Sequence, residues 1–295
     1  MTPPQHALVV LAAGHESDGG RDLAALAPAG AGVHAAAAAP AAAAAPAAAA
    51  APAAAAAPAA AAAPAAAAVH AVAPAGRPLA EAVRSALAAA GERPVCVVPM
   101  TLGRDPRLVA DAARALRWLA AGEGSGRLAL AAPFAAAEHL TGWLRAAAGT
   151  APGAPAAPDG AVLVTAPAAG PFEDAELFRI ARLARQFGRH RWVEVAFDGG
   201  DPDPAEGAAR CRLLGARTVT AVPASFGPAL RTPVPGVRDG GPLLHPSAVT
   251  GVVAARTAAA LHLLGHGEDG IAAGLDAEHG HGHAHSHPHA PAHAH

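Results

Sequence analysis

The sequence predicts an α/β protein of two similar lobes, each built on a parallel sheet that helices cover. Three observations lead to this fold class: short apolar segments alternate with helical segments, the pattern is repeated within the chain, and an Ala/Pro tract interrupts only the first copy. Alternating strands and helices favour parallel sheets with helices on their faces. At 295 residues, the chain is long enough for one large domain or two small ones.

Two pairs of matching segments define the repeat. The segment ALVVLAAGHESDGG begins at Ala7 and AVLVTAPAAGPFED begins at Ala161, an offset of 154 residues. Likewise, ERPVCVVPMTLG begins at Glu92 and ARTVTAVPASFG begins at Ala216, an offset of 124 residues. The offsets differ by 30 residues, the length of five PAAAAA units. The two halves therefore align once the tract is treated as an insertion in the first half.

Each half begins with a short apolar strand that ends in a turn, as expected for a strand that leads into a helix. The helical runs Glu81–Gly91 and Glu206–Ala216 precede the apolar strands VCVVP and TVTAVP, and the strand Arg127–Phe134 precedes the helical run EHLTGWLRAAA. Ligands of such sheets bind beyond the carboxyl ends of the strands, so those loops should line a cleft between the lobes. We expect an N-terminal lobe over residues 1–150, a C-terminal lobe over 151–265 and a disordered tail over 266–295.

The Ala/Pro tract over residues 35–68 is nearly pure Ala, with Pro at positions 40, 46, 52, 58 and 64. Proline breaks a helix, and five residues between prolines are too few to nucleate one. We therefore expect a disordered insertion without a function of its own; a role as a spacer is the alternative.

Composition excludes several classes of function. The net charge of −2 gives no electrostatic reason to expect nucleic-acid binding. The chain has no Lys, which excludes a Lys Schiff base and a P-loop Lys, and we expect no organic cofactor. We see neither a membrane-spanning segment rich in large apolar residues nor a basic leader. Cys96 and Cys211 are distant in the chain and are expected to be buried thiols, which favours a cytoplasmic location.

The C-terminus from Glu278 to His295 is the clearest indication of chemistry. Eight of its residues are His, separated by Gly, Ala, Ser and Pro, so they form neither a core nor one face of a helix; they are His279, His281, His283, His285, His287, His289, His293 and His295. Neutral imidazole is a common ligand for Zn²⁺, Ni²⁺ and Co²⁺, and the segment is predicted to bind such ions as a flexible multidentate tail. An expression tag is the alternative, although tags are usually uninterrupted runs of six His.

Together, these motifs resemble a known family. A strand that ends in GHES (Gly14–Ser17), a strand that ends in VPMTLG, a PF…H segment, a second half that repeats them and a His-rich tail resemble the CbiX-type sirohydrochlorin chelatases, the class II chelatases. The resemblance covers most of the chain outside the Ala/Pro tract. It implies two flavodoxin-like lobes, a cleft for a tetrapyrrole substrate and ATP-independent insertion of Co²⁺, or of Fe²⁺, in cobalamin or siroheme biosynthesis. Ni²⁺ is a further candidate metal.

The resemblance also assigns roles to particular residues. His15 matches the leading His of the family's GHGS motif and would ligate the metal or accept pyrrole protons; Glu16 stands where the motif has Gly. The second half has TAPAAG at the matching point and no His, so that lobe looks inactive. Glu194 matches an acidic strand residue that would accept protons or bind metal, with His70 as its counterpart. The alternatives are a His in a helix-capping turn and a solvated Glu at a strand edge.

The family's second His is absent from this sequence. VVPMTLGRDP offers Arg104 and Asp105 in its place. Arg104 and Arg107 are candidates for binding the carboxylates of a tetrapyrrole, because guanidinium groups pair with carboxylates in a bidentate manner. Arg179, Arg182 and Arg185 are further candidates, although a three-residue spacing more often marks one solvated helix face. His139 and His245 match segments at helix starts and are expected to be structural.

Three functions stay open at this point. The first is a chelatase that inserts Co²⁺ or Fe²⁺, with His15 central and the tail as a metal reservoir. The second is a catalytically degenerate protein that binds and delivers Co²⁺ or Ni²⁺. The third is a scaffold or sensor in the same pathway. The presence of His15 favours the first function, whereas the missing second His favours the second.

Overall fold

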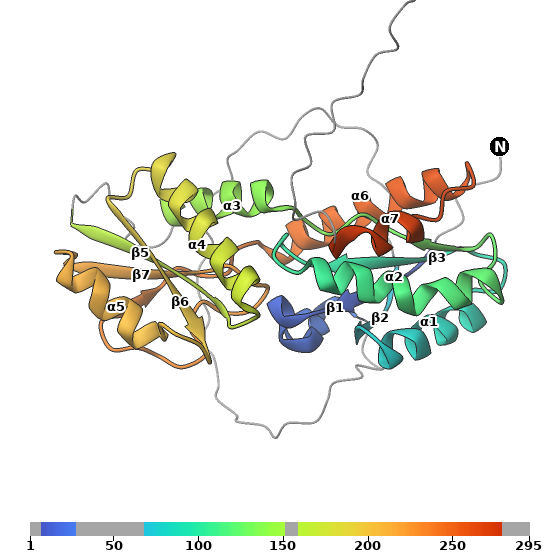
Figure 1. Ribbon diagram of the computed structural model, residues 1–295, viewed down its shortest axis with the longest axis horizontal. Helices are drawn as coiled ribbons and strands as arrows, with labels where there is room; N and C mark the ends of the chain where they lie inside the picture. The colour runs from blue at the N-terminus through green and yellow to red at the C-terminus, as the bar shows by residue number, and fades with distance from the viewer. Residues whose placement is uncertain (1–6, 28–67, 151–158, 279–295) are drawn as a thin grey trace, which may run out of the picture.

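The computed structural model describes residues 7–27, 68–150 and 159–278, and these form two parallel four-stranded sheets (Figure 1). The strand orders are β2-β1-β3-β4 and β6-β5-β7-β8, so the two sheets have the same topology. The predicted α/β fold with two similar lobes is confirmed. Most of the Ala/Pro tract and all eight His of the tail lie outside the described residues.

Within its described residues, the first half contains eight elements: β1 (Leu8–Ala13), the 3₁₀ segment η1 (His15–Leu26), β2 (Ala68–Pro74), α1 (Arg77–Ala90), β3 (Val95–Met100), α2 (Pro106–Ala121), β4 (Leu128–Leu130) and α3 (Ala137–Thr150). The second half also contains eight: β5 (Gly160–Pro167), α4 (Pro171–Gln186), β6 (Trp192–Asp198), α5 (Pro204–Leu213), β7 (Thr218–Pro223), β8 (Val237–Asp239), α6 (Pro246–Leu264) and α7 (Ile271–Leu275). A helix lies between β3 and β4, whereas the matching segment between β7 and β8 has none.

The apolar strands lie at the centre of each sheet. β1 and β3 are apolar at nearly every position because helices cover both faces of the first sheet, and no residue of β3 is exposed. On one face, Val10 and Val97 pack with α1 and α2; on the other face, Val9 and Val98 belong to a core that continues into the second lobe. Burying this apolar surface supplies most of the driving force for the fold.

Each half gives a helix that follows its sheet to the other lobe. α3 follows β4 but packs against α4 and β7, whereas α6 follows β8 but packs against β3 and β4 (Figure 1). As a result, the core on the inner faces of the two sheets is shared: it includes both Leu11 of β1 and Val164 of β5. Because α3 and α6 each pack against the opposite lobe, apolar contacts hold the two lobes in a fixed arrangement. The polar cleft between the lobes is therefore held in place.

The strand pairing corrects the predicted repeat by one residue. Leu8 is paired with Val95 in the first sheet, and Ala161 is paired with Val219 in the second. If Val95 and Val219 are equivalent, as the offset of 124 requires, then Leu8 matches Ala161 at an offset of 153 and not 154. The position equivalent to His15 is therefore Ala168, and the second lobe still has no His there.

The tail begins later than predicted. We expected disorder from residue 266, but residues 266–278 belong to the described part of the chain and include α7, which packs against α2 and β4. Ile271 of α7 is buried in the core beneath α2, which explains why this short segment is ordered. The hydrophobic pattern of five residues was too short to indicate a helix.

Two other expectations can be compared with the structure. Cys96 and Cys211 are free and buried, as predicted, and burial raises the pKa of each thiol to about 12. Among the described helices, α6 is long and apolar enough to cross a membrane by length and composition, which the sequence analysis did not anticipate. Its apolarity comes largely from Ala, and its residues Val249 and Val253 are buried in the shared core.

Candidate functional site

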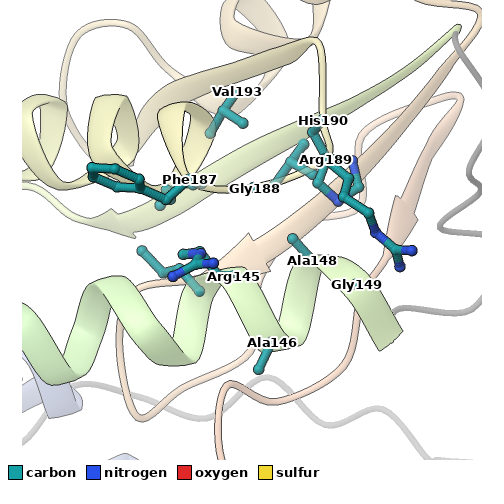
Figure 2. A pocket seen from close by; sticks show the side chains of 13 residues that line it. Arg145, Ala146, Ala148, Gly149, Phe187, Gly188, Arg189, His190 and Val193 are labelled. Carbon is teal, nitrogen blue, oxygen red and sulfur yellow. The ribbon is translucent and has the colours of Figure 1, made fainter.

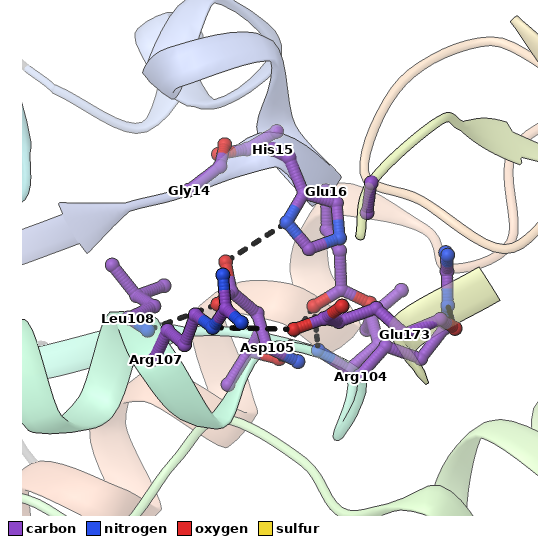
Figure 3. Close-up of polar contacts among 12 residues, drawn as sticks. Gly14, His15, Glu16, Arg104, Asp105, Arg107, Leu108 and Glu173 are labelled. Carbon is purple, nitrogen blue, oxygen red and sulfur yellow. Dashed lines mark hydrogen bonds and ion pairs between the residues drawn. The ribbon is translucent and has the colours of Figure 1, made fainter. Parts of the chain in front are cut away.

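His15 lies at the carboxyl end of the central strand β1, directly after Gly14. Its Nδ1 is 2.9 Å from Oδ2 of Asp105, which follows the neighbouring strand β3 (Figure 3). Both strands are parallel, so their ends meet at the same edge of the sheet. Gly14 permits this contact, because a Cβ at that position would lie 2.5 Å from Asp105 Oδ2.

Asp105 fixes the orientation of the imidazole. Its second oxygen, Oδ1, accepts a hydrogen bond of 2.9 Å from the backbone N–H of Leu108 and so caps α2. The carboxylate is therefore held on one side by the helix and on the other by His15. A His Nδ1–H that donates to a carboxylate leaves Nε2 with its lone pair free, which is the form that binds a metal ion or accepts a proton.

His15 and Asp105 shift each other's pKa. Burial lowers the pKa of His15, but the hydrogen bond to Asp105 and the negative charges of Glu16 and Asp105 outweigh burial, so the pKa lies above its usual 6.5. Burial raises the pKa of Asp105, but the hydrogen bond and charge of His15 outweigh it, so the pKa lies below its usual 3.8. The imidazole is thus a stronger base than a free histidine.

Glu16, next to His15, is a fully buried carboxyl group. Its Oε2 accepts hydrogen bonds from Thr101 Oγ1 at 2.5 Å and from the backbone N–H of Leu102 at 2.9 Å. Burial raises the pKa of Glu16 above its usual value, although the positive charges of Arg104 and His15 oppose that rise. A carboxyl group with a raised pKa can exchange protons closer to neutral pH than an exposed one.

Arg104 joins the first lobe to the second. Its side chain is fully buried; Nε donates to the carbonyl oxygen of Glu173, and Nη2 donates to Asp174 Oδ1, both at 3.3 Å. Glu173 and Asp174 lie in the first turn of α4, in the second lobe. Arg107, at the start of α2, approaches Glu173 from the exposed side, with 3.7 Å between Nε and Oε1. Carboxylates of the second lobe thus lie beside arginine side chains of the first lobe, and both lobes contribute to the site.

Polar atoms without partners gather at this boundary (Figure 3). Of the five buried side-chain nitrogen or oxygen atoms that have no hydrogen-bond partner among the described residues, four belong here: His15 Nε2, Glu16 Oε1, Arg104 Nη1 and Glu173 Oε2. A buried polar atom without a partner is costly and calls for an explanation, such as a water molecule, an ion or a ligand. The concentration of four in one place marks this cleft as the candidate functional site.

A cavity opens from this group of residues toward solvent. It has a volume of about 550 Å³, and its lining residues are Gly103, Arg104, Pro106, Arg107, Phe172, Glu173, Glu176 and Glu278. Glu278 is the last described residue before the His-rich tail, and its Oε2 lies 2.5 Å from Arg114 Nη2. The described part of the chain therefore ends at the wall of this cavity.

The lobes are also bridged beside the site by Arg231. This residue, from the loop between β7 and β8, pairs with Asp22 at 2.7 Å and with Asp18 at 3.3 Å, both in η1. The backbone N–H of Phe226 donates to the carbonyl oxygen of Glu16 at 2.9 Å. The second lobe thus holds η1, the segment that begins with His15, at several points.

The structure brings some of the predicted residues together and separates others. His15, Arg104 and Arg107 lie around the cleft, but two of the nitrogens of Arg104 are already bonded to α4, which leaves Arg107, 65 % exposed, as the accessible guanidinium. Glu194 lies in the edge strand β6, on the face that packs against α5, where its charge acts on Cys211. It therefore faces away from the shared core and the cleft.

The remaining candidates lie outside the cleft. His139 and His245 stand at the starts of α3 and α6, the helix-start positions that the sequence predicted, and each accepts a hydrogen bond from a backbone N–H. His70 falls at an irregularity in the pairing of β1 and β2. Arg179, Arg182 and Arg185 are exposed on α4, as a solvated helix face would be. The histidines from His279 to His295 lie outside the described residues.

Sequence reasoning missed the roles of Glu16, Asp105 and Glu173. Glu16 and Asp105 stood out only as departures from the family's motif, and Glu173 belongs to the half without a motif. The indication available in the sequence was that acidic residues follow two neighbouring strands, directly beside a His and an Arg. Among the described residues, no group of three or more His, Cys, Asp or Glu side chains is close enough to enclose a metal ion.

A second cavity lies between α3, α4 and the sheet of the second lobe (Figure 2). Its volume is about 390 Å³; its lining includes the apolar Val162, Val164 and Val193 together with Arg145, Arg189 and His190. Burial, together with the charge of Arg189, lowers the pKa of His190. This cavity contains none of the partnerless atoms and none of the residues predicted from the sequence, so we place the functional site at His15.

Comparison with known proteins gives two similar structures. No protein-family model and no curated protein matches the sequence. One similar structure is DR2241 of Deinococcus radiodurans, described as a multi-domain protein with structural similarity to chelatases and two additional novel domains; identity is 19 %, the TM-score is 0.47, and the match covers 87 % of this chain but only 55 % of DR2241. The other is SirB of Bacillus subtilis with Fe³⁺, at 15 % identity and a TM-score of 0.47, over 85 % of this chain and 93 % of SirB. At this level of similarity, the function has to be argued from the site.

Proposed function

We propose that this protein is a chelatase that takes a divalent transition-metal ion, Co²⁺ or Fe²⁺, as one substrate and inserts it into a tetrapyrrole, the other substrate. The observation that carries the proposal is the group of four buried polar atoms without partners between the lobes. Two are carboxylate oxygens and one is an imidazole nitrogen, all of which bind divalent metal ions. The resemblance of the GHES and VPMTLG motifs to the class II chelatases names the reaction.

His15 is the proposed first ligand of the incoming ion. Its Nε2 is directed away from Asp105, which orients the ring and increases its basicity. Glu173, from the second lobe, would supply a carboxylate oxygen in place of the family's missing second His. A site with so few protein ligands leaves positions on the ion open, and an ion that has to leave again must not be enclosed.

Glu16 is the proposed acceptor of the pyrrole protons. Insertion requires the macrocycle to lose two N–H protons, and a base that works near neutral pH is best suited to accept them. Burial raises the pKa of Glu16, and its Oε1 has no partner. Glu16 is bonded to Thr101 and Leu102 through Oε2 alone, so it can gain a proton on the other oxygen without breaking these bonds.

The cavity beside these residues is the proposed binding surface for the macrocycle. Arg107 offers a guanidinium group for a substrate carboxylate, and Phe172, which is 83 % exposed, offers an aromatic face for a flat ring. The tail begins beside Glu278 on the same wall. Its eight His residues would therefore raise the local concentration of metal ions next to the cavity, in the role of a reservoir.

The test is a metal-insertion assay. Purified protein is mixed with sirohydrochlorin and Co²⁺, Fe²⁺ or Ni²⁺, and the change in the absorption spectrum of the macrocycle is followed. We expect turnover with at least one ion and a loss of about 10²-fold or more in His15→Gln, because a positioned ligand and base is removed. His139→Gln is the matched control, since His139 is an exposed residue at the start of α3. Turnover that survives in His15→Gln would contradict the proposal.

A metal-delivery protein without catalytic activity is the second candidate. The pairing of Arg104 with the α4 turn favours it, because two of the three guanidinium nitrogens are already bonded and only Nη1 remains for a substrate carboxylate. The same assay separates the two functions. Metal binding without any change in the absorption of the macrocycle would identify a delivery protein.

A further inference from the structure

We propose that His262 and His266, at the end of α6, form a second metal-binding site that takes one borderline divalent cation such as Ni²⁺. The pair lies outside the cleft, outside the tail and outside the residues that resemble the chelatases, so the proposal does not depend on the proposed function. The two residues are four positions apart, which places their side chains on the same face of a helix, one turn from each other.

The end of α6 fixes the relative position of the two side chains. The backbone N–H of Gly265 donates to Leu261 at 3.1 Å, and that of His266 donates to Leu263 at 2.8 Å. Gly267 then takes a φ of +87°, which ends the helix. His266 is thus held by backbone hydrogen bonds one turn beyond His262 and does not belong to a loose segment.

The separation of the rings matches the requirement of a shared metal ion. The ring centres lie 4.8 Å apart, and the planes are inclined at 75°. With a metal–nitrogen distance of about 2.1 Å, two imidazoles in neighbouring positions of an octahedral or tetrahedral ion have ring centres roughly 4.6 to 5.2 Å apart. The observed separation falls within this interval, so small side-chain rotations suffice to direct one nitrogen of each ring at a common point.

Both rings are available to an ion. The two side chains are exposed, and neither makes a hydrogen bond or an ion pair with another described residue. Glu268, also exposed, follows two residues later and adds negative charge beside the pair. Imidazole ligands favour Ni²⁺, Cu²⁺ and Zn²⁺ over Mg²⁺ and Ca²⁺, which prefer oxygen. With only two protein ligands, the ion keeps several water molecules and exchanges readily.

The chelate effect predicts that each of the two histidines depends on the other for metal binding. After one imidazole has bound, the second binds within the same molecule, and such a second contact can strengthen binding by about 10² to 10⁴. Removing either His should therefore release the metal from the other. An exposed pair that merely stacks would not show this dependence.

The test uses the full-length protein and reads each histidine separately, because the His-rich tail is predicted to bind metal as well. Diethyl pyrocarbonate labels imidazoles that are free, and digestion with trypsin and Glu-C yields the fragment 257–268, in which His262 and His266 are the only histidines. We measure labelling of this fragment by mass spectrometry as Ni²⁺ is titrated beyond saturation of the tail. We expect labelling of both residues to fall roughly tenfold, as the chelated pair fills.

The decisive comparison is with His262→Gln. In this variant, His266 should be labelled at the same rate with and without Ni²⁺, at concentrations that protect it in the unaltered protein. His139→Gln is the matched control and should leave the protection of the fragment intact. Protection of His266 that persists in His262→Gln would overturn the proposal, and so would a fragment that Ni²⁺ never protects. Circular dichroism verifies that both variants keep the helical content of the original.

Discussion

The two lobes share one topology but differ in what their loops carry. In the first lobe, the turn after β1 provides Gly14, His15 and Glu16; in the second, the equivalent positions are Pro167, Ala168 and Ala169. After β3, the first lobe provides Thr101 and Asp105, whereas the second has Ser225 and Ala229. The fold was thus kept in both copies while the chemical groups of the turns remain in only one.

The second lobe still contributes to the site, from its helix α4 and its loop after β7. Glu173 and Asp174 meet Arg104 at the boundary, and Arg231 holds the segment that begins with His15. The two lobes therefore contribute different groups to the site. The first lobe carries His15 and Glu16, and the second supplies Glu173, the partners of Arg104 and the contacts that close the cleft.

The largest effect on this division is expected from Arg104→Met. Arg104 is the fully buried link between the lobes, and its removal leaves the part-buried Asp174 and the carbonyl oxygen of Glu173 without their charged donor, so a cost of about 3 kcal/mol, the lower end for a buried pair, is expected. Urea unfolding measures the loss in the free energy of unfolding. Arg182→Gln, on the exposed face of α4, is the control and should change stability by less than about 0.5 kcal/mol. A loss below 1 kcal/mol in Arg104→Met, on the order of a surface pair, would show that this link does not hold the lobes.

The variant Asp105→Asn tests the His15–Asp105 pair, which has no equivalent in the second lobe. Asn caps a helix as well as Asp, so the variant keeps the cap of α2 and removes the negative charge beside His15. The pKa of His15 should fall, which NMR titration of the imidazole measures. The variant should be less stable by about 1 to 3 kcal/mol where both groups are charged.

The stability difference should depend on pH in a defined way. The raised pKa of His15 stabilises the fold fully below 6.5, and this contribution is lost as the pH rises through the folded-state pKa. The lowered pKa of Asp105 stabilises the fold above 3.8, and this contribution is lost as the pH falls through its folded-state value. The gap between Asp105→Asn and the original protein should thus be widest between these two values. A gap of equal size at all pH values would rule out the charged pair.

The variant Glu173→Gln tests whether the second lobe contributes a ligand to the ion. Its Oε2 is buried and has no partner, so the amide should fit with little change in stability while removing a negative ligand. We expect metal affinity at the cleft to fall about tenfold, the smallest of these effects. Glu176→Gln, on the same wall of the cavity, is the control. Affinity that is unchanged in Glu173→Gln would leave the first lobe as the sole source of ligands.

The hydrophobic pattern was sufficient for the central strands and for α1, α3 and α5, because strands such as β3 are apolar throughout and α1 has one apolar face. It was insufficient for β8 (Val237–Asp239), which is short and largely exposed, and for α7, whose order comes from packing against α2. Likewise, the exchange of α3 and α6 depends on how the lobes meet, which no local pattern encodes.

The site was predicted in part, for a related reason. His15 was found because it stands in a local motif at the end of a strand. Glu173 is 69 residues from Arg104 in the chain, and the two meet only because the lobes pack together. The orientation of the imidazole by Asp105 depends on the parallel pairing of β1 and β3, and it could have been anticipated once these strands were placed side by side.

The most direct measurement is the location of bound cobalt by anomalous diffraction from crystals soaked in Co²⁺, since it identifies the ion's ligands whatever the tail binds. We predict an anomalous peak about 2.1 Å from His15 Nε2, on the side of Glu173, and its disappearance in His15→Gln crystals. Cobalt that occupies other histidines in the same crystals while the cleft stays empty would contradict the account.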